Sequence, residues 1–459
     1  MKLKIFFVFS LCLCAFAIQT SAQKRPVKQV AKLNPETAKM VTEVSAKNIE
    51  ATIRKLVSFG TRNTLSAQDD PVRGVGAARD WLFSEYQRIS KDCGNCLDVQ
   101  KQTFTTAASP PPRGRFPEAT VLTNIFAVLK GTTDPDRVYV VSGHYDSMCN
   151  SPTDPKCDAP GANDDASGTA VSLELARVMS KHKYDATIVF MTVPGEEQGL
   201  TGATYYAEQA KLAKMNIEAM FTNDIVGGAT TRKDLPNRDK VRVFSEGIPL
   251  NETEAEARTR KSTGGETDGI SRQLARYIKE QADMYLKGFG AWMIYRRDRY
   301  GRGGDHSPFL ERGYAAVRFT ESEEDFTHQH QTPRTEGGIY YGDTPEYVDF
   351  AYVANVCRVN LTALAGMASA PARPKGVVFA SNRQSADAEL KWEAVKGDDL
   401  AGYEVVWRDT SSAEWTNSEF AGNVATYTVK GKSKDNYFFG VRSLDKAGNK
   451  SIVSYTGGR

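Results

Sequence analysis

The hydrophobic positions between residues 48 and 368 alternate between two spacings, one typical of helices and one typical of strands. Val171, Leu175 and Val178 recur at helical spacing, whereas Thr187–Val193 is a continuous apolar run typical of a buried central strand. This alternation predicts an α/β fold, with a mostly parallel mixed sheet covered by helices on both faces. We expect helices at residues 48–58, 75–89, 203–212, 270–285, 347–367 and from about 169, and strands at 124–129, 138–142, 187–193, 219–223 and 317–320.

The hydrophobic pattern changes after residue 368, where a Pro-rich linker over residues 369–374 precedes a tail without helical spacing. Short alternating segments at 388–392, 403–407, 426–429 and 437–442 predict a small all-β sandwich over residues 375–459. The tail resembles a fibronectin type III module, and this resemblance implies that Trp392 is the core tryptophan and Tyr437 the corner tyrosine. We expect the tail to fold independently and to bind a protein or a polysaccharide.

The N-terminus has the pattern of a secretory signal peptide. Lys2 and Lys4 precede the apolar stretch Ile5–Ile18, and the small residues Ser21 and Ala22 follow it. We therefore expect a cleaved signal peptide over residues 1–22, a lead segment over 23–47, and a secreted or periplasmic protein. No later stretch is long and apolar enough to predict a membrane span.

Charge gives no indication of a nucleic-acid or membrane partner. The 459 residues include 59 Lys and Arg against 56 Asp and Glu, so the net charge is +3, and cleavage of the signal peptide lowers it further. A nearly neutral protein exerts no general attraction on nucleic acid or anionic lipid, so we expect neither as a partner.

Export changes the interpretation of the seven cysteines, of which two lie in the signal peptide. In an oxidising compartment we expect Cys149–Cys157 to close a polar loop and Cys93–Cys96 to close a short turn. The alternative for Cys93 and Cys96 is half a zinc site, but no second pair or nearby His completes it. Cys357 falls on an apolar helix face and is expected to be a buried free thiol.

Polar residues with metal-binding chemistry follow the predicted central strands. His144 comes directly after the strand at 138–142, and Asp146 has a spacing suited to orienting its imidazole. A single His in such a place is more often a surface residue. Further along the chain, Asp164 and Asp165 lie in a Gly-flanked turn at a helix start, where one of them suffices as an N-cap and the second is an excess of negative charge.

Two more strand ends carry carboxylates. Glu196 and Glu197 follow the apolar strand at 187–193, and Asp224 follows the strand at 219–223. Adjacent carboxylates at a buried strand end repel each other and are costly to desolvate, unless one neutralises a metal and the other holds or takes a proton. Solvated glutamates are the simpler alternative, but the apolar strand before them fits it poorly. The segments at 304–307 and 327–332 offer a second imidazole from His306, His328 or His330.

The order Gly-His-Tyr-Asp, Gly-Ala-Asn-Asp-Asp-Ala-Ser-Gly, Gly-Glu-Glu-Gln-Gly-Leu-Thr-Gly, Asn-Asp and a late His resembles the M28 metallopeptidases, the zinc aminopeptidase family, over residues 48–368. The resemblance implies two Zn²⁺ ions bridged by one carboxylate, a general base and a carboxylate behind one ligand. Carried over by position, Asp164 is the bridge, His144 and Asp224 complete one site, Glu197 and His330 complete the other, Glu196 is the base and Asp146 supports His144.

Two details follow from the resemblance. His328 and His330 compete for the last ligand position, and the segment Gln331–Pro333 favours His330 because it resembles the segment that follows the ligand in the family. His306 and Tyr300 are expected to line the substrate pocket and to bind no metal.

The sequence therefore predicts an exported di-zinc aminopeptidase that acts on peptides with a free N-terminus. One alternative is a glutaminyl-cyclase-like enzyme, which shares the fold but works with one zinc ion; the doubled carboxylates at Asp164 and Asp165 favour two metals. The other alternative is a catalytically inactive adhesion or binding protein, suggested by the tail and disfavoured by the complete set of ligand types.

Overall fold

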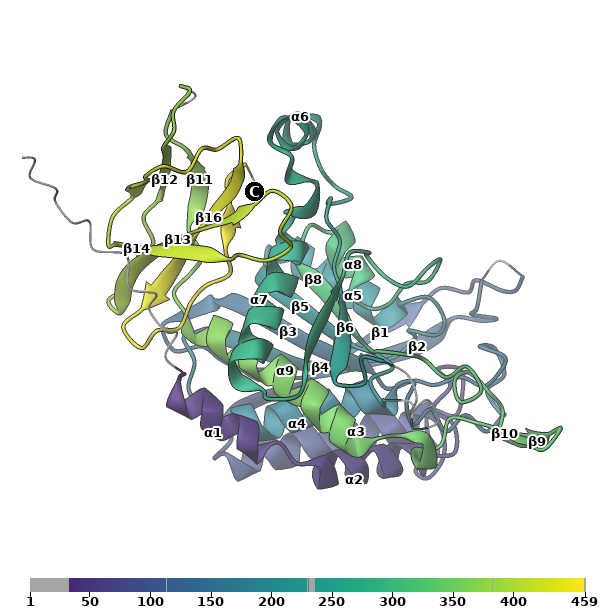
Figure 1. Ribbon diagram of the computed structural model, residues 1–459. Coiled ribbons are helices and arrows are strands. Elements are labelled where there is room, and N and C mark those ends of the chain that lie inside the picture. The colour runs from purple at the N-terminus through teal and green to yellow at the C-terminus, as the bar shows by residue number, and fades with distance from the viewer. Residues whose placement is uncertain (1–32, 113, 229, 231–235, 382, 458–459) are drawn as a thin grey trace, which may run out of the picture. The chain divides into compact units, whose positions relative to one another are not determined.

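A mixed sheet of eight strands, in the order β1-β2-β4-β3-β5-β8-β6-β7, forms the centre of the protein (Figure 1). Strands β4, β3, β5 and β8 run parallel to one another. On one side β2 is antiparallel to β4 and β1 is antiparallel to β2, and on the other side the parallel pair β6–β7 is antiparallel to β8. The strands are β1 (Leu97–Thr106), β2 (Thr120–Leu129), β3 (Asp134–His144), β4 (Ala186–Val193), β5 (Asn216–Asn223), β6 (Lys240–Phe244), β7 (Gly290–Ile294) and β8 (Ala316–Glu321).

This computed structural model describes residues 33–457 except 113, 229, 231–235 and 382. The predicted signal peptide over residues 1–22 and the first part of the lead segment lie outside the described residues. The end of the lead segment is helical: α1 covers Pro35–Glu43, with the Asn34 side chain as its N-cap, and α2 begins at Ala46.

Helices cover both faces of the sheet. One hydrophobic core packs α1, α2, α3, α4, α7 and α9 against the first face, and a second core packs α5 and α8 against the other. The mostly parallel sheet with helices on both faces confirms the predicted fold class. The helices are α1, α2 (Ala46–Val57), α3 (Val75–Asp92), α4 (Ala166–Met179), α5 (Thr201–Leu212), α6 (Glu254–Thr263), α7 (Ile270–Tyr285), α8 (Ser307–Glu311), α9 (Phe350–Ser369) and the short 3₁₀ turns η1 (Gly265–Thr267) and η2 (Pro345–Tyr347).

The central strands end side by side. In the register of the sheet His144 pairs with Val193 of β4, and Ser142 pairs with Thr222 of β5. All eight residues of β4 are buried, as its continuous apolar sequence predicts. Because β3, β4 and β5 are parallel, the segments that follow them leave the sheet at the same edge.

Residues 375–459, as far as described, form two antiparallel sheets around a core of their own (Figure 1). Trp392 is buried there and its ring packs on Tyr403 at a centroid distance of 5.3 Å. One sheet contains β11 (Lys375–Phe379), β12 (Ala388–Glu393) and β15 (Thr426–Val429); the other contains β14 (Asn417–Gly422), β13 (Leu400–Asp409), β16 (Tyr437–Asp445) and β17 (Ser454–Tyr455). The predicted all-β tail is confirmed, and its likeness to a fibronectin type III module stays a prediction.

The tail packs on the rest of the chain through buried ion pairs. Arg408 of β13 is 1% exposed and donates to both carboxylate oxygens of Asp268 at 2.9 and 2.7 Å. Arg442 of β16 pairs with Glu280 of α7 at 2.6 Å. The linker is also held, since Arg137 donates to the carbonyl of Ala370 at 2.7 Å. Through these contacts the tail supplies charged partners to buried groups of the larger domain, and its independent folding stays a prediction.

Two smaller features complete the fold. The hairpin β9 (Arg334–Glu336) and β10 (Ile339–Tyr341) projects from the loop region beyond β8 (Figure 1). Cys357 is a free and buried thiol on α9. None of the helices within the described residues is both long and apolar enough to cross a membrane.

Candidate metal centre

The edge where β3, β4 and β5 end carries the candidate site. His144 is the last residue of β3, Glu196 and Glu197 follow β4, and Asp224 follows β5. The start of α4 approaches this edge closely, since a Cβ on Gly168 would lie 2.0 Å from the carbonyl oxygen of Asn223. Glycine at this position therefore brings the helix start, and the turn before it, against the strand ends.

Two carboxylates outside the ligand set, Asp165 and Asp343, hold the turn before α4 by accepting from backbone N–H groups. Asp165 caps α4 by accepting from the backbone N–H of Gly168 at 2.8 Å, and its other oxygen accepts from the N–H of His144 at 3.0 Å. Asp343 accepts from the N–H groups of Asn163 and Asp164, both at 2.7 Å. Of the two adjacent carboxylates, Asp165 is thus the N-cap, and the side chain of Asp164 is left to face the strand ends.

Asp164 faces two histidines, one with each carboxylate oxygen. Its Oδ1 lies 3.1 Å from Nε2 of His144, and its Oδ2 lies 2.8 Å from Nε2 of His330. The same nitrogen of His330 lies 3.0 Å from Oε1 of Glu197, and Nε2 of His144 lies 3.8 Å from Oδ1 of Asp224. The five residues thus form two groups of metal-ligand atoms that share Asp164.

Three of the ligand atoms have no hydrogen-bond partner among the described residues, which is typical of atoms that bind a metal. Nε2 of His144, Nε2 of His330 and Oε1 of Glu197 are buried and form no hydrogen bond of acceptable geometry within the described residues. Native proteins rarely leave such atoms unpaired. Burial lowers the pKa of His330, but the carboxylates of Glu197 and Asp164 outweigh this and raise it to about 11. The cluster therefore demands a cation, and imidazole with carboxylate oxygens is a zinc-type donor set.

Asp146 links the first strand end to the second. Its Oδ1 lies 3.3 Å from Nδ1 of His144, on the side of the imidazole away from Asp164. Its carboxylate also accepts from the backbone N–H groups of Glu196 at 3.3 Å and Glu197 at 3.2 Å, and from the hydroxyl of Thr64 at 3.0 Å. Asp146 thus contacts His144, which it is predicted to support, and also holds the turn that carries Glu196 and Glu197.

Glu196 lies beside the donor atoms without belonging to the two groups that share Asp164. A carboxylate oxygen of Glu196, a ring nitrogen of His144 and an oxygen of Glu197 lie within 4.8 Å of one another. Burial raises the pKa of Glu196 well above its usual value, and the charges of Asp224 and Glu197 add to this effect. A carboxyl group with a raised pKa is suited to accepting and returning protons near neutral pH.

The structure distinguishes the two competing histidines. His328 is buried, its Nδ1 lies 2.9 Å from the carbonyl oxygen of Gly342, and its ring stacks on Tyr347 at a centroid distance of 3.5 Å. His330 has a left-handed backbone with φ of 52° and points its Nε2 at Asp164 and Glu197. A non-glycine residue in this conformation is uncommon and is often functional. The geometry therefore favours His330 as the ligand.

Besides Asp343, three buried residues at the site were not predicted from the sequence. Arg318, on β8, lies 2.6 Å from Oδ2 of Asp224 and holds the pKa of that carboxyl below its usual value against the effect of burial. Gln329 donates to Oδ2 of Asp164 at 3.2 Å. Asp305 is fully buried, and burial raises its pKa to about 8. Only the motif around His306 offered a signal for Asp305.

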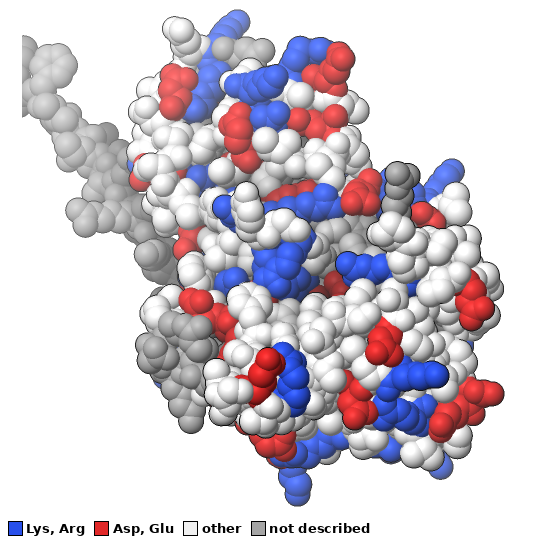
Figure 2. All heavy atoms as spheres, turned by 90° about the vertical axis from the view of Figure 1, so that its right-hand side faces the viewer, with Lys and Arg blue, Asp and Glu red and all other residues white. Residues whose placement is uncertain are grey.

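The two residues expected in the substrate pocket lie in different surroundings. Tyr300 is 88% exposed and lines a cavity of about 770 Å³, together with Trp292, Phe326 and the arginines 242, 296, 299 and 302. Figure 2 shows Lys and Arg side chains gathered around the hollow in the middle of this face of the molecule. His306 is fully buried and its Nε2 lies 2.8 Å from the carbonyl oxygen of Arg297. His306 therefore faces the interior, contrary to the expectation that it lines the pocket.

Both expected cysteine pairs are joined. Cys93–Cys96 and Cys149–Cys157 are disulfides with Cα–Cα distances of 5.6 and 6.5 Å. Cys149, Cys157 and Asp154 also lie close enough to resemble a metal site, but the disulfide consumes both thiolates. The candidate metal centre is therefore confined, among the described residues, to the strand ends and the loop with His330.

Comparison with known proteins agrees with this geometry. A probable zinc metalloprotease of Pyrenophora tritici-repentis is 44% identical over 422 residues, which are 92% of this chain and 86% of the relative. A probable zinc metalloprotease of Pyricularia oryzae is 45% identical over 415 residues, 89% of this chain and 82% of the relative.

One solved structure supports the fold. The crystal structure of the Legionella pneumophila LapA aminopeptidase matches with a TM-score of 0.52 at 18% identity, covering 76% of this chain and 78% of that chain. At this identity the match concerns the fold alone. Residues 124–336, which include every candidate ligand, match Peptidase family M28. With this match and the extent of the similarity to the zinc metalloproteases, the chain belongs to peptidase family M28.

Proposed function

We propose that the protein is an exported di-zinc aminopeptidase. Its general class, a zinc-dependent peptidase, follows from its family and from relatives named as zinc metalloproteases. The observation that carries the finer proposal is the position of Asp164, whose two carboxylate oxygens lie 3.1 and 2.8 Å from the Nε2 atoms of His144 and His330. A carboxylate between two imidazoles is the arrangement that two metal ions sharing one ligand require.

The residues divide into two sets around this bridge. His144 and Asp224 would hold one zinc ion with Asp164, and Glu197 and His330 would hold the other with it. Zinc in such a site supplies Lewis acidity, which polarises a carbonyl group and lowers the pKa of a water molecule. Arg318 keeps Asp224 ionised, and Asp146 orients His144, so both residues keep ligands in the form that binds a metal.

Glu196 is proposed as the general base and acid. Its raised pKa and its place within 4.8 Å of ligand atoms suit it to take a proton from the attacking water. The same carboxyl then returns the proton to the nitrogen of the leaving amine as the peptide bond breaks. Asp146 fixes the backbone of Glu196, which limits how far the base can move from the reacting water.

The substrate is proposed to be a peptide with a free N-terminus, bound with one end in the cavity that Tyr300 lines. Aromatic side chains line this cavity, and Glu324 pairs with three of its arginines, so the cavity can hold an apolar side chain of the peptide. The disulfides at Cys93–Cys96 and Cys149–Cys157 support export, because such bonds persist in oxidising compartments.

The geometry disfavours both alternative functions. A glutaminyl-cyclase-like enzyme with one zinc needs only one ligand set, whereas this chain presents two sets that share Asp164. An inactive adhesion protein on the same fold has no use for a costly buried cluster of carboxylates and unpaired imidazoles.

A substrate panel tests the proposal. Aminoacyl compounds and peptides with free or blocked N-termini are incubated with the purified protein, with added zinc and with a chelator. We expect cleavage of the free substrates alone, lost on chelation and restored by zinc. Cleavage of blocked peptides but not of free ones overturns the aminopeptidase assignment, and a protein saturated by one zinc per chain overturns the two-metal site.

A further inference from the structure

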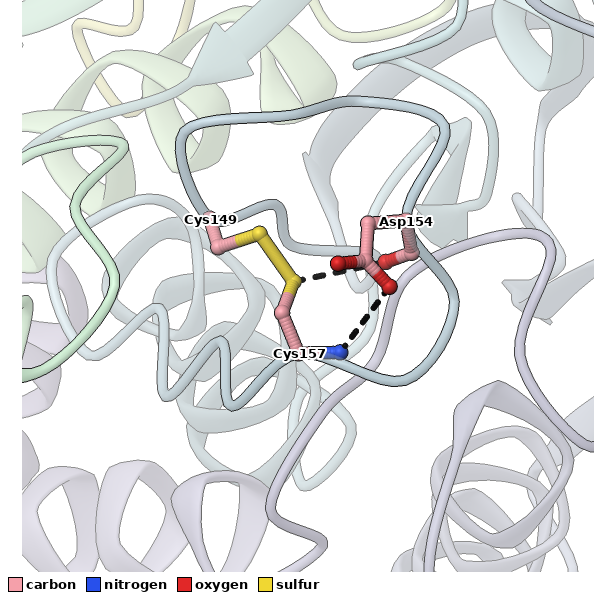
Figure 3. A group of neighbouring side chains, drawn as sticks. All are labelled: Cys149, Asp154 and Cys157. Atoms are coloured by element: carbon pink, nitrogen blue, oxygen red, sulfur yellow. Dashed lines mark hydrogen bonds between the residues drawn. A yellow bond between two sulfur atoms is a disulfide. The ribbon is translucent and has the colours of Figure 1, made fainter.

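The disulfide-closed loop, residues 149–157, lies between two metal-ligand residues of the sequence. It begins five residues after His144 and ends seven residues before Asp164. The Cys149–Cys157 disulfide closes it, and Oδ1 of Asp154 accepts from the backbone N–H of Cys157 at 3.2 Å inside the ring (Figure 3). The loop is therefore constrained twice, by a covalent bond and by an internal turn.

This loop also contacts two of the three other segments that carry ligands. The carbonyl oxygen of Pro152 accepts from the side-chain amide of Gln198, the neighbour of Glu197, at 2.8 Å. Oδ1 of Asn150 accepts from the backbone N–H of Thr332, two residues after His330, at 3.0 Å. Through these hydrogen bonds one short loop is joined to the segments that carry Glu197 and His330.

Glu197 and His330 are the two ligands that, with the shared Asp164, are assigned above to one metal ion. Asp224, which belongs to the other set, is instead held by Arg318 on β8, away from the loop. The sequences around Glu197 and His330 are a turn and a loop, whereas His144 ends a strand of the sheet. The loop-borne ligands consequently depend more on local contacts for their position than the sheet-borne ligands do.

We propose that the Cys149–Cys157 disulfide is a positioning element for the metal site of Asp164, Glu197 and His330. Gln198 and Thr332 transmit its effect, because both are hydrogen-bonded to the disulfide-closed loop. Gln198 is next to Glu197 in the sequence, and Thr332 is two residues after His330. The proposal rests on the two-metal site described under Proposed function. It predicts that opening the disulfide lowers the zinc affinity of one metal site only. If the bond served only to stabilise the fold, opening it would lower the melting temperature and leave the zinc affinity of both sites unchanged.

The test uses paired disulfide variants and metal titration of the full-length mature protein. The double variant Cys149→Ser with Cys157→Ser, called the clamp variant below, opens the disulfide that is proposed to position the ligands. Cys93→Ser with Cys96→Ser is the matched control, since this second disulfide closes the turn after α3, where the sulfurs lie near the carbonyl oxygens of Ser90 and Ser180 and both cysteines pack against the core. Zinc is titrated into metal-free protein against a chromophoric chelator, and the visible spectrum of the Co²⁺-substituted protein reports ligand geometry.

We expect two zinc equivalents in the wild type and in the control pair. In the clamp variant, one equivalent binds roughly 10–100-fold more weakly, the range typical for losing a residue that orients a metal ligand. His330→Ala identifies that equivalent, because it removes the same site directly. The Co²⁺ spectrum changes for this equivalent and is preserved for the other.

Asn150→Ala provides a second test that leaves the disulfide and the fold intact. It removes the hydrogen bond to Thr332 and should weaken the same equivalent, by less than the double Ser variant does. Unchanged zinc affinity in Asn150→Ala and in the clamp variant overturns the proposal, and so does an equal loss at both sites or the same loss in the control pair. A wild type that binds a single zinc instead overturns the two-metal site itself, so the two failures are distinguishable.

Discussion

The carboxylate of Asp146 lies 3.2 Å from the backbone nitrogen of Glu197 and accepts its hydrogen bond, so the segment after β3 fixes the turn after β4. The other oxygen of this carboxylate lies 3.3 Å from the ring of His144. One buried group therefore sets the distance between ligands that lie more than fifty residues apart in the sequence. Losing its charge should affect the metals more than it affects the fold.

Asp146→Asn should lower zinc affinity roughly 10–100-fold while the protein stays folded. The amide keeps the shape, but its NH₂ group faces N–H donors and can no longer hold His144 as a carboxylate does. Zinc titration followed by circular dichroism measures the two effects. Asp136→Asn, at an exposed position of β3, is the matched control and should bind zinc as the wild type does. Equal zinc affinity in both variants would exclude this role of Asp146.

Glu196 and Glu197 should respond differently to the same substitution. Glu196→Gln keeps the shape and removes the base, so it should retain both zinc ions and lose about 10²–10⁴-fold in kcat. Glu197→Gln removes a ligand charge, so it should bind less zinc, with activity partly restored at high zinc concentration. Elemental analysis and kinetics on the same preparations separate the two. If Glu196→Gln lost zinc and Glu197→Gln kept it without activity, the roles would be exchanged.

The histidine pair gives a third prediction. His330→Ala should empty one metal site, because its Nε2 faces Asp164 and Glu197. His328→Ala should keep both zinc ions and lower the melting temperature, because that ring stacks on Tyr347. Asp164→Ala should reduce both metals. Metal content by elemental analysis decides, and the reverse pattern for the two histidines would make His328 the ligand.

The central part of the fold could be predicted because its sequence signals are local. The apolar run that forms β4 and the polar motif directly after it lie within a dozen residues, so strand, turn and candidate ligand were predicted together. In contrast, β1 is an edge strand of largely polar sequence with about half of its positions exposed, and it was missed. The short strands β6 and β7, on the opposite edge, were missed as well.

The supporting residues of the site could not be predicted for a related reason. Asp343 acts on Asp164 from 179 positions away, and Arg318 acts on Asp224 from 94 positions away. Neither lies in a motif with metal-binding chemistry, and an isolated Asp or Arg is ordinary on a protein surface. Only the folded chain reveals that they are buried beside the ligands. The same holds for Arg408, whose partner Asp268 belongs to the other domain.

The contact between Arg408 and Asp268 gives a fourth prediction. Arg408→Met removes a buried cation that contacts both oxygens of Asp268. That carboxylate is left with Arg276, at 2.8 Å, and neutral donors such as Gln273, so the free energy of unfolding should fall by about 3 kcal/mol. Chemical denaturation measures this loss. Arg383→Met, at an exposed position of the tail, should change stability little. Zinc content should be unaffected in both variants. An Arg408→Met protein as stable as the control would support the independent module expected from the sequence.

Glu404 makes the stability of the tail depend on acid. Burial raises the pKa of this carboxyl, but Arg442 and Lys450 outweigh burial and lower it from 4.5 to about 2. Because the folded pKa is below the unfolded one, its contribution is complete above about pH 4.5 and is lost as the pH falls toward 2. The shift corresponds to at most roughly 3 kcal/mol.

Glu404→Gln should therefore lower the melting temperature at neutral pH, and its difference from the wild type should shrink between about pH 4.5 and pH 2. Calorimetric scans of both proteins across this range measure the difference. Glu389→Gln, at an exposed position of β12 in the other sheet of the tail, is the control and should show no such convergence. A difference between Glu404→Gln and the wild type that stays constant down to pH 2 would show that the carboxylate of Glu404 is not the group that acid neutralises in the tail, because its loss by mutation and its protonation must have the same effect.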